Sequence, residues 1–154
     1  MIDIINGNIL NCSENIIVHQ TNCLGVMGAG LALQLRKKYP IIFDKYKILC
    51  DLYKKFPNSL MGYTQIVNVD NSKYVMNCFG QLSYGTGLQT DYESLKLSLN
   101  QVKEYAEYNN LSVAIPYKIG CGLAGGDWNI VYKIIEDIFA KSSIKCVIYK
   151  YGDN

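Results

Sequence analysis

Two glycine-rich segments, residues 22–30 and 119–127, hold the residue types best suited to binding an anion. The first follows the apolar run 16–18 and the second follows 113–116, so each is expected between a strand and a helix. Glycine lets backbone N–H groups approach a ligand closely, and a helix N-terminus adds a partial positive charge beside them. Two such loops suit a diphosphate flanked by two sugars better than a single phosphate.

Proton transfer beside these loops would fall to His19 or Asp127. An imidazole can activate water or protonate a leaving oxygen, although a single histidine is as often a structural residue. Asp127 could orient or deprotonate water, but its place before an apolar helical pattern also suits an N-cap. Both roles stay open for each residue. Cys23 and Cys121 also lie in the loops, but the sequence places no histidine near Cys121, and we do not expect a cysteine nucleophile.

The composition is that of one folded domain. The chain has 154 residues, 49% of them apolar, and we expect a single domain over residues 1–154. A net charge of +2 argues against binding through a nucleic-acid backbone. The six cysteines and one histidine form no zinc-ligand pattern, so we expect no metal and no cofactor. With no signal-peptide pattern and no run of roughly 18 apolar residues, we expect a cytoplasmic protein, by default a monomer, with no membrane contact.

The secondary-structure pattern alternates strands with helices. Short apolar or β-branched runs predict strands at 2–5, 16–20, 63–69, 74–79, 111–115 and 145–150, with a hairpin over 62–79. Apolar spacing predicts helices at 31–39, from Pro40 to about 55, after a capping box at 90–93, and after an N-cap at Asp127. This order predicts an α/β fold with a mixed sheet of about six strands and helices on both faces. Ligands of such sheets bind at the carboxyl ends of the strands, where both glycine loops would emerge.

Three motifs resemble, in order, those of the macrodomain family, the ADP-ribose-binding fold. Residues 4–10 resemble its first strand and the turn after it, 19–32 its first phosphate loop, and 116–123 its second. The set covers nearly the whole chain and implies a three-layer α/β/α sandwich. Its details are similar to the branch that holds terminal ADP-ribose glycohydrolases and ADP-ribose-1″-phosphate phosphatases.

The resemblance also implies a pose for ADP-ribose. Asn8 replaces the family's usual aspartate and would read the adenine edge, unless it only forms a turn; Tyr149 would stack on the base, unless it only packs. Asn22 would bond a hydroxyl of the distal ribose, and Gln81 would do likewise or line the cleft. The implied ligand-binding residues are Gly7, Asn8, Ile9, Asn22, Met27, Gly28, Ala29, Gly30, Leu31, Gln81, Ile119, Gly120, Cys121, Gly122, Leu123, Ala124 and Tyr149.

Two positions depart from the glycohydrolases of this branch, which use a lysine after the fourth strand and an aspartate after the second glycine loop. Gln81 stands at the first position and Ala124 at the second. A glutamine cannot form a covalent lysyl adduct. His19 matches a histidine of the phosphatase-like members, so the expected catalytic residues are His19, Asp127 and Asn22. Residues 84–87 are expected to form a flexible flap that excludes water or selects the distal substituent.

These observations favour a hydrolase that recognises ADP-ribose and removes a substituent from its distal ribose. The substituent would be a protein or nucleobase linkage, or a phosphate. Positioning and loop N–H groups would supply most of the acceleration. The expected partner is ADP-ribose or an ADP-ribosylated macromolecule, without sequence-specific nucleic-acid contact. The alternatives are a non-catalytic ADP-ribose reader or sink, and an unrelated nucleotide-binding α/β domain.

Overall fold

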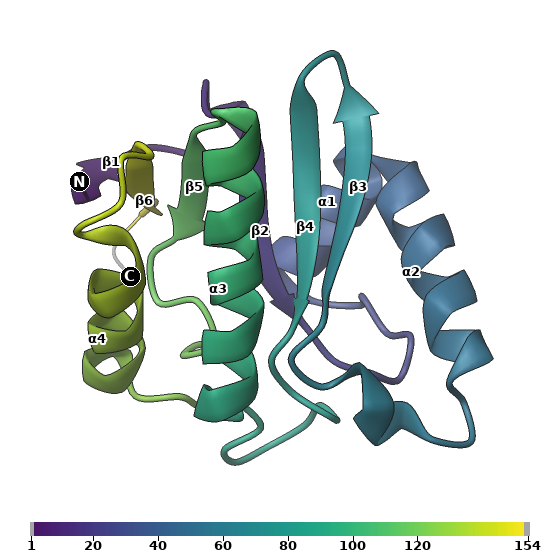
Figure 1. The fold of residues 1–154 in the computed structure, drawn as a ribbon. Helices are drawn as coiled ribbons and strands as arrows, with labels where there is room; N and C mark the ends of the chain where they lie inside the picture. The colour runs from purple at the N-terminus through teal and green to yellow at the C-terminus, as the bar shows by residue number, and fades with distance from the viewer. Residues whose placement is uncertain (1, 153–154) are drawn as a thin grey trace.

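The computed structural model of the protein describes residues 2–152. Its strands form one six-stranded sheet in the order β1-β6-β5-β2-β4-β3. Neighbouring strands are parallel except β3 and β4, which pair antiparallel as a hairpin. The prediction of a mixed sheet is therefore confirmed (Figure 1). The strands are β1 (Ile2–Asn6), β2 (Ile16–Thr21), β3 (Thr64–Asp70), β4 (Lys73–Phe79), β5 (Val113–Pro116) and β6 (Cys146–Lys150).

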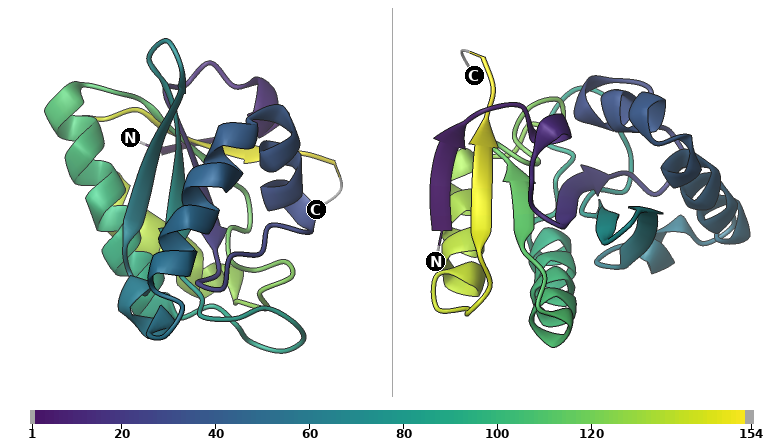
Figure 2. Two further views of the ribbon diagram at one scale, coloured as in Figure 1. Left: turned by 90° about the vertical axis from the view of Figure 1, so that its right-hand side faces the viewer. Right: turned by 90° about the horizontal axis from the view of Figure 1, so that it is seen from above.

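Helices cover both faces of this sheet in the part of the chain that the structure describes. They are α1 (Gly30–Lys38), α2 (Pro40–Leu52), α3 (Tyr92–Asn109) and α4 (Trp128–Phe139), with short 3-10 turns η1 (Ile9–Asn11) and η2 (Pro57–Leu60). Figure 2 shows α1 and α2 on one side of the strands and α3 and α4 on the other. The fold is the three-layer α/β/α sandwich that the sequence predicts.

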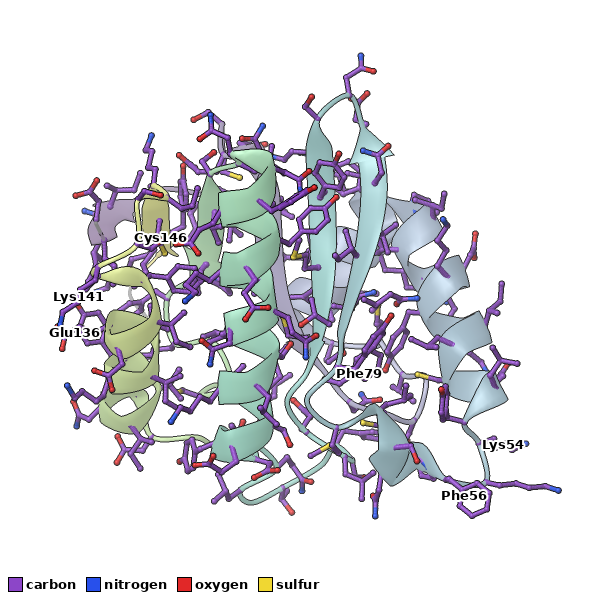
Figure 3. The ribbon with its side chains drawn as sticks, viewed as in Figure 1. Lys54, Phe56, Phe79, Glu136, Lys141 and Cys146 are labelled. Atoms are coloured by element: carbon purple, nitrogen blue, oxygen red, sulfur yellow. The ribbon has the colours of Figure 1, made fainter. Side chains whose placement is uncertain are left out.

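The sheet divides the core into two halves, and the central strand β2 contributes to both, because successive side chains of a strand point to opposite faces. Ile16 and Val18 pack with α3 and α4, whereas Ile17 packs with α1 and α2. Phe79 of β4 belongs to the α1–α2 half and lies on that side of the strands in Figure 3. By contrast, Phe56 after α2 projects away from the body of the molecule and is 71% exposed.

One predicted helix start is wrong. The capping box at 90–93 does not form: α3 begins at Tyr92, its N-cap is Asp91, and the Asp91 carboxylate accepts from the Ser94 hydroxyl at 2.6 Å rather than from a backbone N–H. The Thr90 hydroxyl donates instead to the carbonyl of Gly120, 2.6 Å away in the second glycine loop. The predicted N-cap of α4 is confirmed: Asp127 accepts a hydrogen bond from Asn129 N at 2.9 Å.

The loops after β2, β4 and β5 gather at one edge of the sheet, the lower edge in Figure 1. Both glycine-rich segments belong to this edge. No helix within residues 2–152 is long and apolar enough to cross a membrane. Over the same residues, no group of three His, Cys, Asp or Glu side chains is placed to hold a metal ion.

Candidate functional site

A cleft of about 790 Å³, the main cleft, lies between the two glycine loops. Loop 1, residues 22–32, forms one wall, and loop 2, residues 116–124, forms the other. Tyr84 and Gly85 of the predicted flap stand at its edge. This volume falls within the range of about 300–1,000 Å³ that is typical of small-molecule sites.

A smaller hollow of about 180 Å³, the side pocket, continues the main cleft. The two share Leu31, Pro116 and Tyr117. The side pocket is lined further by Asn8, Ile9, Gln34, Tyr149 and Tyr151. Among the described residues, no aspartate or glutamate lines either hollow. A long anionic ligand therefore finds one continuous groove without a repelling carboxylate.

The structure brings almost all the predicted site residues to this groove. Those that line the main cleft are His19, Asn22, Met27, Gly28, Ala29, Gly30, Leu31, Gln81, Ile119, Gly120, Cys121, Gly122, Leu123 and Ala124. Asn8, Ile9 and Tyr149 line the side pocket. Gly7 lines neither hollow, but it packs against a wall of the side pocket: a Cβ on it would lie 3.4 Å from the Tyr149 ring.

Loop 1 supplies the uncapped start of α1. The N-cap residue Ala29 offers no side-chain acceptor, and the backbone N–H groups of residues 28–32 donate to no protein acceptor within the described chain. The first four N–H groups of a helix need such partners, and they carry the positive end of the helix dipole. Because these residues line the main cleft, the start of α1 is a ready site for an anion.

Loop 2 is held by its own backbone. Cys121 N donates to Lys118 O at 2.8 Å, and Gly126 N donates to Gly120 O at 2.9 Å. These bonds leave the N–H groups of Gly122, Leu123 and Ala124 without a protein acceptor in the described structure. A Cβ on Gly126 would lie 2.5 Å from Gly120 O, so the loop can follow this path only with glycine there. Residues 122–124 line the same cleft as the start of α1.

A profile of the Macro domain family matches residues 18–135. The chain belongs to this family. The DNA ADP-ribosyl glycohydrolase of Mycobacterium tuberculosis is 29% identical to this macrodomain over 148 residues, which are 94% of this chain and 40% of that protein. The macrodomain thus spans about two fifths of the length of that relative.

Two further comparisons agree with this family. The ADP-ribose 1″-phosphate phosphatase of Saccharomyces cerevisiae is 29% identical over 139 residues, which are 86% of this chain and 75% of that protein. The solved macrodomain of Mycobacterium tuberculosis DarG superposes with a TM-score of 0.81 at 26% identity, and the match covers 97% of each chain. The family expected from the three motifs is confirmed.

Asn22 organises loop 1 from within. Its Oδ1 accepts from Leu24 N at 3.0 Å and from the Tyr46 hydroxyl at 2.7 Å, and its Nδ2 donates to Val26 O at 2.8 Å. An amide nitrogen carries two hydrogens, so one N–H remains for a ligand. Asn22 is thus foremost a residue that shapes the loop, a role that the sequence did not indicate.

His19 lies at the floor of the main cleft and is 2% exposed. Its Nε2 lies 2.6 Å from Asn77 Oδ1 on β4. Burial lowers the pKa of the imidazole from 6.5 to about 4, although the bond to Asn77 acts in the opposite direction. His19 is therefore neutral at pH 7. Its Nδ1 is buried without a hydrogen-bond partner in the described chain.

The structure does not place Asp127 in the cleft. The side chain is exposed and caps α4, and the residue lines neither hollow. Its backbone N–H is not free to donate to a ligand either, because it donates to the Tyr92 hydroxyl at 3.0 Å. The expectation of a catalytic Asp127 is therefore not carried further, since the cap explains the residue. Trp128, the first residue of α4, packs between Tyr117 and Tyr132 with ring centroids 4.9 and 5.7 Å away.

For Asn8 and Tyr149, the structure is compatible with both expected roles, the structural one and contact with a ligand. Asn8 caps η1, because its Oδ1 accepts from Leu10 N at 3.0 Å, yet it also lines the pocket with its Nδ2 uncommitted. Tyr149 donates its hydroxyl to buried Glu14. Burial alone would raise the pKa of Glu14, but the hydrogen bonds from Tyr149 and Lys145 lower it. The Tyr149 ring is thereby fixed at the pocket wall.

Sequence reasoning missed Gln20, which links three parts of the cleft. Its Nε2 donates to Gln81 Oε1 at 2.8 Å and to Thr90 Oγ1 at 2.9 Å. Gln81 in turn donates to Ser83 O at the base of the flap. Gly120 makes room for this amide, since a Cβ there would lie 3.0 Å from Gln20 Oε1. Gln20 therefore couples the flap to loop 2, through bonds that its position in a strand does not reveal.

Lys118 was also missed. It is exposed, lines the main cleft, and is the one charged side chain that does so among the described residues. Its φ of +63° is unusual for a residue other than glycine, and such strain gathers at functional sites. The sequence feature that could have marked it as a site residue is that Lys118 is the single charged residue in the stretch 116–126.

The cysteines of the loops are inert as nucleophiles. Burial raises the pKa of Cys23 to about 12 and that of Cys121 to about 11. A thiolate, not a thiol, is the nucleophile. This agrees with the expectation that neither cysteine attacks a substrate.

Proposed function

We propose that this macrodomain binds ADP-ribose in the groove and hydrolyses the bond between C1″ of its distal ribose and a substituent. The observation that carries the proposal is the two rows of unbonded N–H groups, from residues 28–32 and 122–124, on residues that line one cleft without carboxylates. Each row supplies donors to one side of a diphosphate, which no single loop could surround.

The groove favours one orientation of the ligand. The side pocket is lined by Asn8 and aromatic rings, and it suits a flat base with a polar edge. The diphosphate then lies between the loops, with Lys118 close to its charge. The distal ribose falls beyond them, near Asn22 and the flap. Its substituent leaves the cleft past Tyr84.

The chemistry follows from what lines the cleft beside that ribose. Water attacks C1″, the bond to the substituent breaks, and free ADP-ribose remains; in the phosphate case the equivalent hydrolysis releases phosphate. His19 is neutral at pH 7, and once the bound ligand opens the cleft floor over the buried Nδ1, the lone pair there can accept a proton or a hydrogen bond from the attacking water or a ribose hydroxyl. Since a base with a pKa of about 4 is weak, most of the acceleration comes from the loop N–H groups and positioning.

The relatives support a hydrolytic function of this type. One is named a DNA ADP-ribosyl glycohydrolase and another an ADP-ribose 1″-phosphate phosphatase. The two names differ in what hangs from the distal ribose, and this chain has equal identity to both. The linkage must therefore be found by experiment.

A second function, a non-catalytic reader of ADP-ribose, is favoured by the same lack of carboxylates. Gln81 bonds Gln20 and Ser83, and Ala124 has no side chain that can handle a proton. Such a cleft binds through its main chain whether or not a reaction follows.

One set of measurements separates the two functions. The protein is titrated with ADP-ribose by calorimetry, then incubated with ADP-ribosylated DNA, glutamate-linked ADP-ribosyl protein and ADP-ribose 1″-phosphate. Release from at least one substrate is expected; tight binding without release from any would leave only the reader. Gly122→Val is the control for the site, because its Cβ has open space and the new side chain fills the cleft. It should keep its unfolding temperature and lose binding.

We also propose that residues 1–154 act as one macrodomain, and that it is a cytoplasmic monomer. All six cysteines are free thiols, which suits a reducing compartment. Sedimentation at micromolar concentration should give the mass of a single chain.

A further inference from the structure

His19, Asn77 and Gln65 sit directly opposite one another on three neighbouring strands. His19 of β2 pairs with Asn77 of β4, and Asn77 pairs with Gln65 of β3. Their side chains form a chain of hydrogen bonds on the face of the sheet that α1 and α2 cover. The bonds are His19 Nε2 to Asn77 Oδ1, 2.6 Å, and Asn77 Nδ2 to Gln65 Oε1, 2.9 Å. Gln65 Nε2 ends the chain on the backbone carbonyl of Lys45 in α2, 3.1 Å away.

The Lys45 carbonyl fixes the direction of every bond in this chain. A carbonyl oxygen can only accept, so Gln65 must present its NH₂ to Lys45 and its oxygen to Asn77. Asn77 must then donate through Nδ2 and accept through Oδ1. The group facing Asn77 Oδ1 has to be a donor, and therefore Nε2 of His19 carries the proton.

We propose that Asn77 and Gln65 are positioning residues that hold His19 in its Nε2-protonated tautomer, so that Nδ1 offers a lone pair to the cleft floor. A neutral imidazole has one donor and one acceptor nitrogen, and the partner of one nitrogen decides the role of the other. Nδ1 is buried and has no protein partner in the described chain, so a ligand or water reaches its lone pair only where the cleft floor opens over it. The inference deepens the proposed function, on which the use of that lone pair rests.

No charged group competes for the imidazole. Burial lowers its pKa and the bond to Asn77 partly opposes this, with no ionised side chain among the causes of the shift. The other titratable side chains with shifted pKa on this half of the core are Cys23, Cys50, Tyr46 and Tyr149, and burial raises the pKa of each, so they remain neutral. The charged residue of the cleft, Lys118, lies in loop 2 and is not among the causes of the pKa shift of His19.

The chain offers a direct test, because His19 is its only histidine. In protein labelled with ¹⁵N-histidine, NMR at pH 7 should show a proton bonded to Nε2 and a bare Nδ1. A proton on Nδ1, or averaging between the two tautomers, would overturn the proposal. This readout needs no substrate, so the tautomer can be right even if no substrate is turned over, and that result would count against the proposed function alone.

Gln65→Leu tests the direction of the chain. Without the anchor on Lys45 O, the Asn77 amide is free to turn over and present either end to His19, so signals of both tautomers are expected. The matched control is Gln101→Leu, which removes an amide that joins the start of β3 to α3 through Thr64 N and Gly62 O. The control should keep the wild-type histidine spectrum. An unchanged spectrum in Gln65→Leu would show that Gln65 does not help to hold the tautomer of His19.

Asn77→Asp tests the second link. The carboxylate keeps an acceptor opposite Nε2–H but adds a negative charge, which should raise the pKa of His19 by about one to three pH units. With any substrate that is turned over, the acid limb of kcat should move to higher pH by the same amount, while KM changes little. A pKa of His19 that stays near the wild-type value of about 4 would refute the contact on which the proposal stands.

Discussion

The burial of His19 should make the stability of this macrodomain fall steeply in mild acid. In the folded state the pKa of His19 is about 4, whereas an unfolded chain titrates it at 6.5. The stabilising contribution is present above the unfolded pKa and is lost as the pH falls towards the folded one, because only the unfolded chain binds the proton in that window. The full difference corresponds to about 3 kcal/mol, and the part lost between about pH 7.5 and about pH 5 is about 2 kcal/mol.

Carboxylates also begin to titrate in this range, so the effect must be isolated by substitution. His19→Gln keeps an N–H that can reach Asn77 and has no titratable group. Urea unfolding of both proteins can be followed by the fluorescence of Trp128, the one tryptophan in the chain. The gap in unfolding free energy between the wild type and His19→Gln should change by about 2 kcal/mol from about pH 7.5 to about pH 5. Curves that stay parallel within about 0.5 kcal/mol would show that His19 is not buried in its neutral form.

Three further substitutions test the site. Asp127→Ala removes the cap of α4 and should lower the unfolding free energy by about 1 kcal/mol without changing ADP-ribose affinity or turnover; lost turnover at unchanged stability would restore Asp127 as a catalytic residue. Lys118→Ala should weaken ADP-ribose binding about three- to fivefold at low salt, as for an exposed ion pair, and the difference should shrink at high salt; equal affinities at low salt would contradict a contact with the diphosphate. Gly126→Ala puts a Cβ 2.5 Å from Gly120 O, so calorimetry should show binding weakened at least tenfold, and wild-type affinity would mean that the path of loop 2 does not matter.

Much of the fold could be predicted because its signals are local. The strands are short apolar runs, and the start of α4 follows from one residue, Asp127, placed before an apolar helical pattern. Glycine is also a local signal, and so the two loops that line the cleft could be found. The capping box at 90–93 was a local signal of the same kind, yet it was wrong, because Gly120 and Gln20 engage the Thr90 hydroxyl from far along the chain.

The hydrogen bonds that define the site join residues far apart in the sequence, so they could not be predicted from local patterns. The tautomer of His19 is set by Asn77 and Gln65, which face it only because β2, β4 and β3 are neighbours in the sheet. The spacing of residues in a sequence does not say which strands pair or in what register. Lys118 was missed for another reason: what marks it is its left-handed backbone, which the sequence does not display.

The rows of free amides have a consequence for how this macrodomain can evolve. Every residue except proline carries a backbone N–H, so most substitutions at residues 28–32 and 122–124 change a side chain and leave the donor in place. Selection on ligand binding therefore acts on the path of the main chain, through glycines such as Gly126, and on the open space beside Gly122, rather than on the chemistry of the side chains. Related sequences can therefore diverge to below about one third identity and keep the same arrangement of backbone N–H donors. In the cleft that these donors line, positions such as Gln81 and Ala124 can then gain or lose the reactive side chains that make a binding site catalytic.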